Sequence, residues 1–222
     1  MMPFAGGIEG LSNGTLIFSA ISAFFYLAAL RQPPSWRRTV TKTAATGLLA
    51  VLALIEGGPW LLVAALALSA AGDAFLSQDG EQAFLGGLGS FLLAHIAYVA
   101  LFVMTGAGIE ILTAQTWRIP LPVIVLIASV PLIMRLIPAV GHALRIPVAV
   151  YVTAILAMMI ASAMVPAPIV MIGAALFVAS DAILASERFL LSAWSWHRIW
   201  TGPAVWVLYY LAQLAITLGF II

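Results

Sequence analysis

"AFLGGLGSFLLAHIAYVALFVM", residues 83–104, decides the fold class of this chain. The run contains no Asp, Glu, Lys or Arg, and it exceeds the roughly 18 apolar residues that indicate a membrane-spanning helix. Similar runs recur along all 222 residues, of which 64% are hydrophobic and 8% charged, against about a quarter charged in soluble domains. A membrane β-barrel would instead show short alternating segments. The composition therefore predicts an all-α, polytopic membrane protein.

Eight apolar runs are long enough to be spans, and we expect a helix on each of them: 11–30, 40–56, 59–77, 83–104, 120–138, 145–165, 168–186 and 200–221. Eight spans of about 20 residues occupy about 160 positions. We therefore expect one integral membrane domain over residues 1–222 and no soluble domain. The opening "MMPFAGGIEG" has no basic region, so we expect the first span to be retained and not cleaved as a signal peptide.

The cations predict the orientation, because Lys and Arg favour cytoplasmic loops. If the first loop, "RQPPSWRRTVTK", faces the cytoplasm, one cation of the nine falls outside, Arg118. The others fall at or near the inner face: Arg31, Arg37, Arg38, Lys42, Arg135, Arg145, Arg188 and Arg198. Both termini then lie outside the cytoplasm, and in a bacterium the membrane would be the inner (plasma) membrane.

Two aspartates stand inside apolar runs in the same frame, A-[G/S]-D-A-x-L, at Asp73 and Asp181. In the predicted topology both lie near the inner end of an outside-to-inside span. The first four spans also align with the last four in the same orientation, so we expect a parallel internal repeat with halves 11–104 and 120–221. Intramembrane carboxylates usually face the bundle interior and act in function, whereas a purely structural role would be a helix cap or an ion pair.

Other polar residues recur inside the spans. His95 and Tyr98 share one helix face, and so do Tyr210 and Gln213, because each pair is three residues apart. The remaining candidates are Lys42, Tyr151 and Ser180. Each of these alone is typical of an interhelical hydrogen bond, but together they can line a polar pocket around the two carboxylates.

Several kinds of site are excluded or disfavoured. The absence of cysteine excludes disulfides and thiolate chemistry. The three histidines lie on different segments without an HExxH motif, so we expect no metal, and no motif indicates a cofactor. No basic patch indicates nucleic-acid binding. The segment 187–200 mixes Trp with Arg188 and Arg198, so it is either an interfacial entrance for a lipid or an ordinary anchored loop.

Four blocks in order resemble the YhhN-type lysoplasmalogenase family: "AAGDAFL…FLGGLGSFLLAHIAY" from residue 70, "VAVYVTAILAMM" from 148, "GAALFVASDAILASERF" from 173 and "YYLAQLAI" from 209. Each block is weak alone, but together they are specific. The resemblance implies an eight-helix membrane enzyme that hydrolyses the vinyl ether bond of lysoplasmalogens. The products are a fatty aldehyde and glycerophosphoethanolamine or glycerophosphocholine. The resemblance also implies that Asp73 and Asp181 are the catalytic pair.

The chemistry suits two carboxyl groups. Protonating the β-carbon of a vinyl ether gives an oxocarbenium ion, which water captures as a hemiacetal that then collapses. One carboxyl group can donate the proton while an ionised one stabilises the cation, as in glycosidases. Ser180 can donate a hydrogen bond that favours ionised Asp181, whereas Gly72 before Asp73 cannot, so we favour Asp73 as the acid. Lys42, Arg188 or Arg198 can hold the substrate phosphate.

Two other functions fit the sequence. Intramembrane carboxylates and parallel repeats also suit a proton-coupled transporter of a small solute or a lipid. However, Pro-rich span 120–138 has no matching Pro in span 11–30. A lipid-binding or assembly protein without chemistry is the third interpretation. The partners we expect are a lysophospholipid substrate and membrane lipid, and the sequence does not indicate an oligomeric state.

Overall fold

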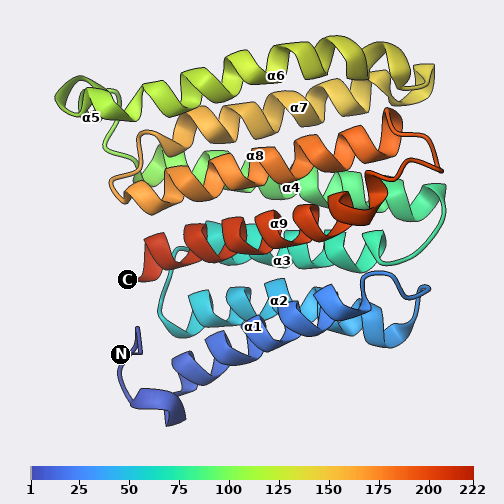
Figure 1. The fold of residues 1–222 in the computed structure, drawn as a ribbon. Coiled ribbons are helices and arrows are strands. Elements are labelled where there is room, and N and C mark those ends of the chain that lie inside the picture. The colour runs from blue at the N-terminus through green and yellow to red at the C-terminus, as the bar shows by residue number, and fades with distance from the viewer. Residues whose placement is uncertain (1) are drawn as a thin grey trace. The chain divides into compact units, whose positions relative to one another are not determined.

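The computed structural model describes residues 2–222, and within this range every regular element is helical (Figure 1). Short 3-10 helices η1 (Gly7–Glu9) and η2 (Thr116–Arg118) lie before the first and sixth α-helices. The α-helices are α1 (Leu11–Ala29), α2 (Trp36–Ile55), α3 (Trp60–Leu76), α4 (Glu81–Thr105), α5 (Glu110–Ala114), α6 (Pro120–Ala139), α7 (His142–Ser162), α8 (Pro168–Phe189) and α9 (Arg198–Ile221). The prediction of an all-α fold is confirmed, and seven of the described helices are long and apolar enough to cross a membrane, which fits a multi-pass membrane protein.

Each of the eight predicted spans coincides with one helix, but α3 is shorter than the others. It has 17 residues, which at 1.5 Å per residue extend about 25 Å, somewhat less than the roughly 30 Å of a bilayer hydrocarbon core. The other seven helices qualify as candidate spans by length and composition. An eighth span therefore stays a prediction, and it concerns the helix that carries Asp73.

At two charged segments the helices extend beyond the predicted spans. Helix α2 begins at Trp36, because the side chain of Ser35 caps it by accepting a hydrogen bond from the Arg38 amide at 3.3 Å. Helix α8 continues to Phe189, so Glu187 and Arg188 belong to its last turn and not to a loop. Hydropathy locates the apolar part of a helix, whereas capping decides where the helix itself begins and ends.

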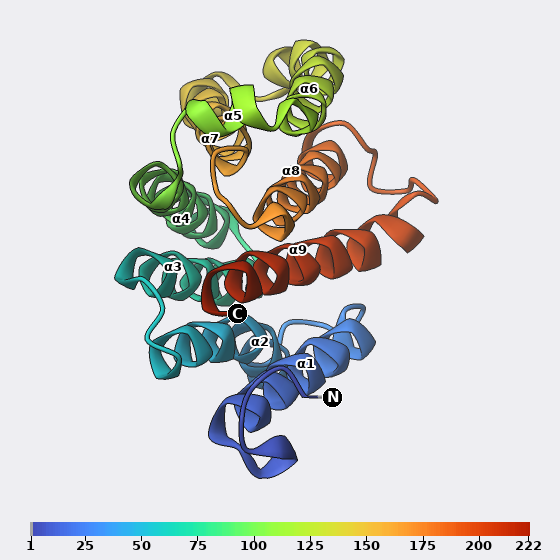
Figure 2. The same cartoon turned by 90° about the vertical axis from the view of Figure 1, so that its left-hand side faces the viewer.

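The chain divides into two compact units: unit 1 is residues 2–101 with Ile216–Ile222, and unit 2 is Phe102–Ala215. In unit 1, α2 lies between α1 and α3 and packs on both (Figure 2). Its interior is a stripe of fully buried residues at helical spacing on α2 and α3: Ala45, Leu49, Leu52, Ala53, Leu62, Ala65 and Leu66. In unit 2, α6, α7 and α8 each pack on the other two, around buried Leu136, Val140 and Val148.

A glycine beside Asp73 allows the aromatic ring of Phe91 to pack closely. A Cβ atom added at Gly72 would lie 2.7 Å from two ring atoms of Phe91. This distance is shorter than carbon atoms tolerate, so α3 and α4 depend on glycine at this point. At Gly89, also on α4, an added Cβ atom meets nothing within 4 Å.

We therefore expect Gly72→Ala and Gly89→Ala to change stability in opposite directions. The first substitution displaces the Phe91 ring and should lower the free energy of unfolding by about 1–3 kcal/mol, the usual cost of overpacking. The second should raise it by about 0.5–1 kcal/mol, because alanine favours the helix. Unfolding in mixed micelles measures both values. A Gly72→Ala variant as stable as Gly89→Ala would contradict the close packing.

Candidate active site

Asp73 lies on α3 in the interior of unit 1, with polar partners from α2. Its residue is 1% exposed, and Lys42 Nζ stands 3.5 Å from its Oδ1 atom. The hydroxyl of Thr46 donates a hydrogen bond of 2.9 Å to its Oδ2 atom. Lys42 and Thr46 are four residues apart, so both project from the same face of α2. We call these three residues the Asp73 cluster.

The ammonium group of Lys42 also has an aromatic neighbour from α1. Its Nζ atom lies 5.6 Å from the ring centroid of Tyr26, and that ring is buried. This geometry is a cation–π contact, which attracts a cation to the face of an aromatic ring. Three helices of unit 1 therefore determine the position of Lys42: α1, α2 and α3.

Hydroxyl groups extend the contact between α2 and α3 beyond the Asp73 cluster. The hydroxyls of Thr39 and Ser77 are 2.7 Å apart, and Gln78 donates to Thr39 at 2.8 Å. Thr39 and Thr46 are functional candidates that our sequence analysis missed. Their signal was present, because residues 39, 42 and 46 follow the i, i+3, i+7 spacing of one helix face.

Asp181 lies on α8 in unit 2 and also accepts a hydrogen bond from the preceding long helix. The hydroxyl of Tyr151 on α7 donates to its Oδ2 atom at 2.6 Å. Neighbouring Ser180 donates at 2.9 Å to the carbonyl of Val205 on α9. The hydroxyl of Ser180 therefore joins α8 to α9, and this is a different partner from the Asp181 carboxylate that the sequence suggested.

The other predicted site residues lie on α4 and α9. His95 and Tyr98 are fully buried on α4, within unit 1. Tyr210 and Gln213 are buried on α9, within unit 2, and the ring of Tyr210 stacks on Trp206 with centroids 6.3 Å apart. The structure thus brings Lys42 to Asp73 and Tyr151 to Asp181. The two aspartates belong to different units.

Two arginines in unit 2 donate hydrogen bonds to backbone carbonyls of connecting segments. Arg118 is 1% exposed and donates to the carbonyls of Ala163, Val165 and Pro166, at 3.4, 2.7 and 2.6 Å. Arg198 forms an ion pair with Glu187 at 3.4 Å. It also donates to the carbonyl of Glu187 in the last turn of α8 and to those of Leu191 and Ser192 in the connection to α9. Arg198, which we considered for the phosphate, is therefore engaged in holding this loop.

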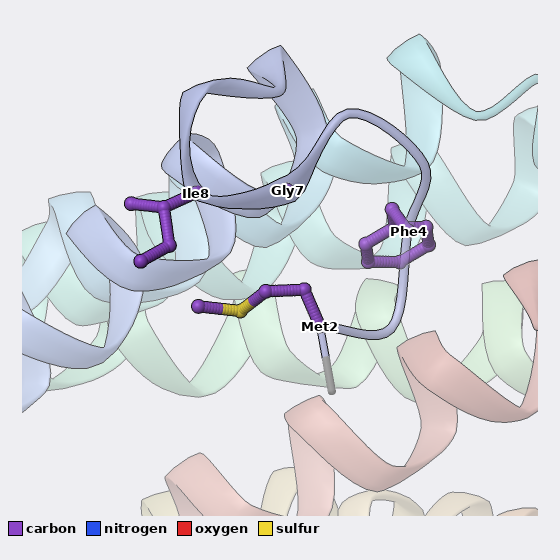
Figure 3. Close-up of a pocket in the computed structure, with 4 residues that line it drawn as sticks. All are labelled: Met2, Phe4, Gly7 and Ile8. Atoms are coloured by element: carbon purple, nitrogen blue, oxygen red, sulfur yellow. The ribbon is translucent and has the colours of Figure 1, made fainter.

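A surface hollow is lined by Met2, Phe4, Gly7 and Ile8 (Figure 3). The side chain of Asn13 holds this segment by donating to the carbonyls of Phe4 and Gly7, both at 2.8 Å. The hollow has no ionisable side chain. It adjoins the start of α1. Tyr26, the aromatic neighbour of Lys42, lies 15 residues after Leu11, about 22 Å further along the same helix. We therefore do not propose this hollow as the catalytic site.

Within residues 2–222 no group of three His, Asp or Glu side chains is placed to hold a metal ion. The reactive candidates are the carboxyl groups of Asp73 in unit 1 and Asp181 in unit 2. Each one is held by a donor from the neighbouring long helix.

Comparisons with known proteins agree on one family. The model of the YhhN family matches residues 37–220. Two curated relatives, from Mycobacterium bovis and Mycobacterium tuberculosis, are both named lysoplasmalogenase. Each is 31% identical over 216 residues, covering 90% of this chain and 79% of the relative. No solved structure matches the chain significantly.

Proposed function

Because this chain belongs to the YhhN family, we propose that it hydrolyses the vinyl ether bond of lysoplasmalogens with Asp73 and Asp181 as its catalytic residues. The products are a fatty aldehyde and glycerophosphoethanolamine or glycerophosphocholine. The relatives named lysoplasmalogenase support a hydrolase of this kind, and they lend no support to the alternative of a transporter. The observation that carries the choice of residues is the pair of hydrogen-bonded carboxyl groups inside apolar helices.

We propose that α3 is a membrane span as well, which makes eight spans with both termini outside the cytoplasm. The chain then acts on lipid within the membrane. An internal repeat is supported by the similar surroundings of the two aspartates. Asp73 accepts from Thr46 on the helix before its own, and Asp181 accepts from Tyr151 in the same way.

The proposed reaction adds one water molecule and needs no net proton. One carboxyl group gives its proton to the β-carbon of the vinyl ether, which leaves an oxocarbenium ion. Water adds to the carbon that bears the ether oxygen and loses a proton, which restores the carboxyl group. The hemiacetal then breaks its bond to the glycerol oxygen, which takes the hydroxyl proton. A second, ionised carboxyl group stabilises the cation electrostatically.

The remaining polar residues receive supporting roles in this proposal. Tyr151 holds the carboxyl group of Asp181 through the hydrogen bond of 2.6 Å. Ser180 fixes α9 beside α8, and α9 carries Tyr210 and Gln213, which we propose orient water or substrate oxygens. His95 and Tyr98 have the same proposed role on α4.

Protonation at carbon gives the function a specific isotopic test. Purified protein acting on an alkenyl-lysophosphoethanolamine in D₂O should release an aldehyde with one deuterium on the carbon next to the carbonyl. The matched control is the acyl-lysophosphoethanolamine, from which we expect no aldehyde. Mass spectrometry of the trapped aldehyde measures both. Aldehyde without this deuterium, or release of fatty acid only, would contradict cleavage by carbon protonation.

A further inference from the structure

The Asp73 cluster contains a pair of opposite charges, Lys42 and Asp73, in the interior of unit 1. The side chain of Lys42 is 11% exposed and that of Asp73 is 1% exposed. Burial by itself disfavours a charge, but an opposite charge within about 4–6 Å favours the charged form of each group, and Lys42 Nζ lies 3.5 Å from Asp73 Oδ1. The hydroxyl of Thr46 adds a donor to the second oxygen of the carboxylate.

We propose that Lys42 and Thr46 hold Asp73 as a carboxylate, so that Asp73 stabilises the cationic intermediate while Asp181 donates the proton. Lys42 is then a positioning residue that acts through Asp73. This inference rests on the proposed function, because it divides that reaction between the two aspartates. It reverses the assignment that the sequence favoured, which rested on Ser180 as a donor to Asp181. Ser180 instead donates to the carbonyl of Val205.

The position of Lys42 also argues against its predicted role as a phosphate ligand. Its ammonium group lies 3.5 Å from Oδ1 of Asp73 and 5.6 Å from the ring centroid of Tyr26, so it contacts residues of α1 and α3 from α2. A phosphate bound there would compete with the carboxylate for the same cation and bring a second anion into the interior. The ammonium group is therefore placed to balance the charge of Asp73.

Kinetic measurements distinguish a Lys42 that positions Asp73 from a Lys42 that binds the substrate phosphate. We expect Lys42→Met to lower kcat about 100-fold and to change KM by less than about threefold, since it removes an interaction that matters to the transition state. Lys42→Arg retains the charge and should stay within about tenfold of the wild type. In Lys42→Met/Asp73→Asn the loss should equal that of Asp73→Asn alone, because Lys42 acts through Asp73. An increase in KM at constant kcat would overturn the proposal in favour of phosphate binding.

The charge of Asp73 can be measured without turnover. The infrared difference between the wild type and Asp73→Asn should show carboxylate bands, and in a Lys42→Met background the same difference should show a protonated carboxyl band. If Lys42→Met does not fold, Thr46→Val carries the kinetic test, with kcat lowered about tenfold and KM unchanged. A protonated Asp73 in the wild type would overturn the inference. A wild type that does not cleave lysoplasmalogen would refute the proposed function, while the infrared result would still decide the charge.

Discussion

Asparagine in place of Asp181 is expected to lower kcat/KM for an alkenyl-lysophospholipid about 10²–10⁴-fold. This range is the usual contribution of a positioned general acid, and the amide is nearly the same size as the carboxyl group but has no acidic proton to give. Asp73→Asn should cost about 10²–10³-fold, the typical effect of removing electrostatic stabilisation of a developing charge. Aldehyde release by each purified variant measures both losses.

The control for these substitutions is Asp79→Asn, which makes the same chemical change at an exposed position. We expect it to retain the wild-type rate. The double variant Asp73→Asn/Asp181→Asn should lose little more than the slower single variant, because residues that act in one reaction are not additive. Wild-type turnover in a folded Asp181→Asn protein would contradict a catalytic role for that residue.

Alanine in place of Arg118 is expected to lower the free energy of unfolding by about 3 kcal/mol or more. Three carbonyl oxygens accept from its guanidinium group, and each loses a donor at about 1 kcal/mol. These carbonyls follow the end of α7 at Ser162, in a connection where no regular helix supplies them with backbone donors. A cation at a helix C-terminus is also favourable because of the helix dipole.

Unfolding in mixed micelles measures this loss, and Arg37→Ala is the control. Arg37 is exposed and lies 5.6 Å from the ring of Trp36, so its removal should cost no more than about 1 kcal/mol. Similar stabilities of Arg118→Ala and Arg37→Ala would show that the three carbonyl contacts do not hold unit 2 together.

The apolar helices could be predicted from the sequence because the membrane imposes a length and a composition on each span. All eight predicted ranges coincide with helices. The bounds differ by a few residues at helix ends such as Trp36 and Phe189, and whether the short helix α3 spans the membrane stays a prediction. Hydropathy reports solvent preference, and it does not report the hydrogen bonds that end a helix.

The candidate site was partly predictable. The repeated frame singled out Asp73 and Asp181, and polar residues in apolar helices singled out Lys42 and Tyr151. Their partners could not be predicted, because the register between two packed helices decides which side chains meet. The structural role of Arg118 was missed, because we counted this residue only as the one cation outside. A count of cations does not distinguish one that faces the aqueous phase from one that binds backbone carbonyls.

The measurement that tests the account most directly is aldehyde release by detergent-purified wild-type protein from an alkenyl-lysophosphoethanolamine, beside the alkyl ether of the same chain length. The alkyl ether has no double bond to protonate. We predict aldehyde from the alkenyl lipid alone, and its loss in Asp73→Asn and in Asp181→Asn. A folded wild-type protein that releases no aldehyde, or one whose two variants remain fully active, would contradict vinyl ether hydrolysis by this pair of carboxyl groups.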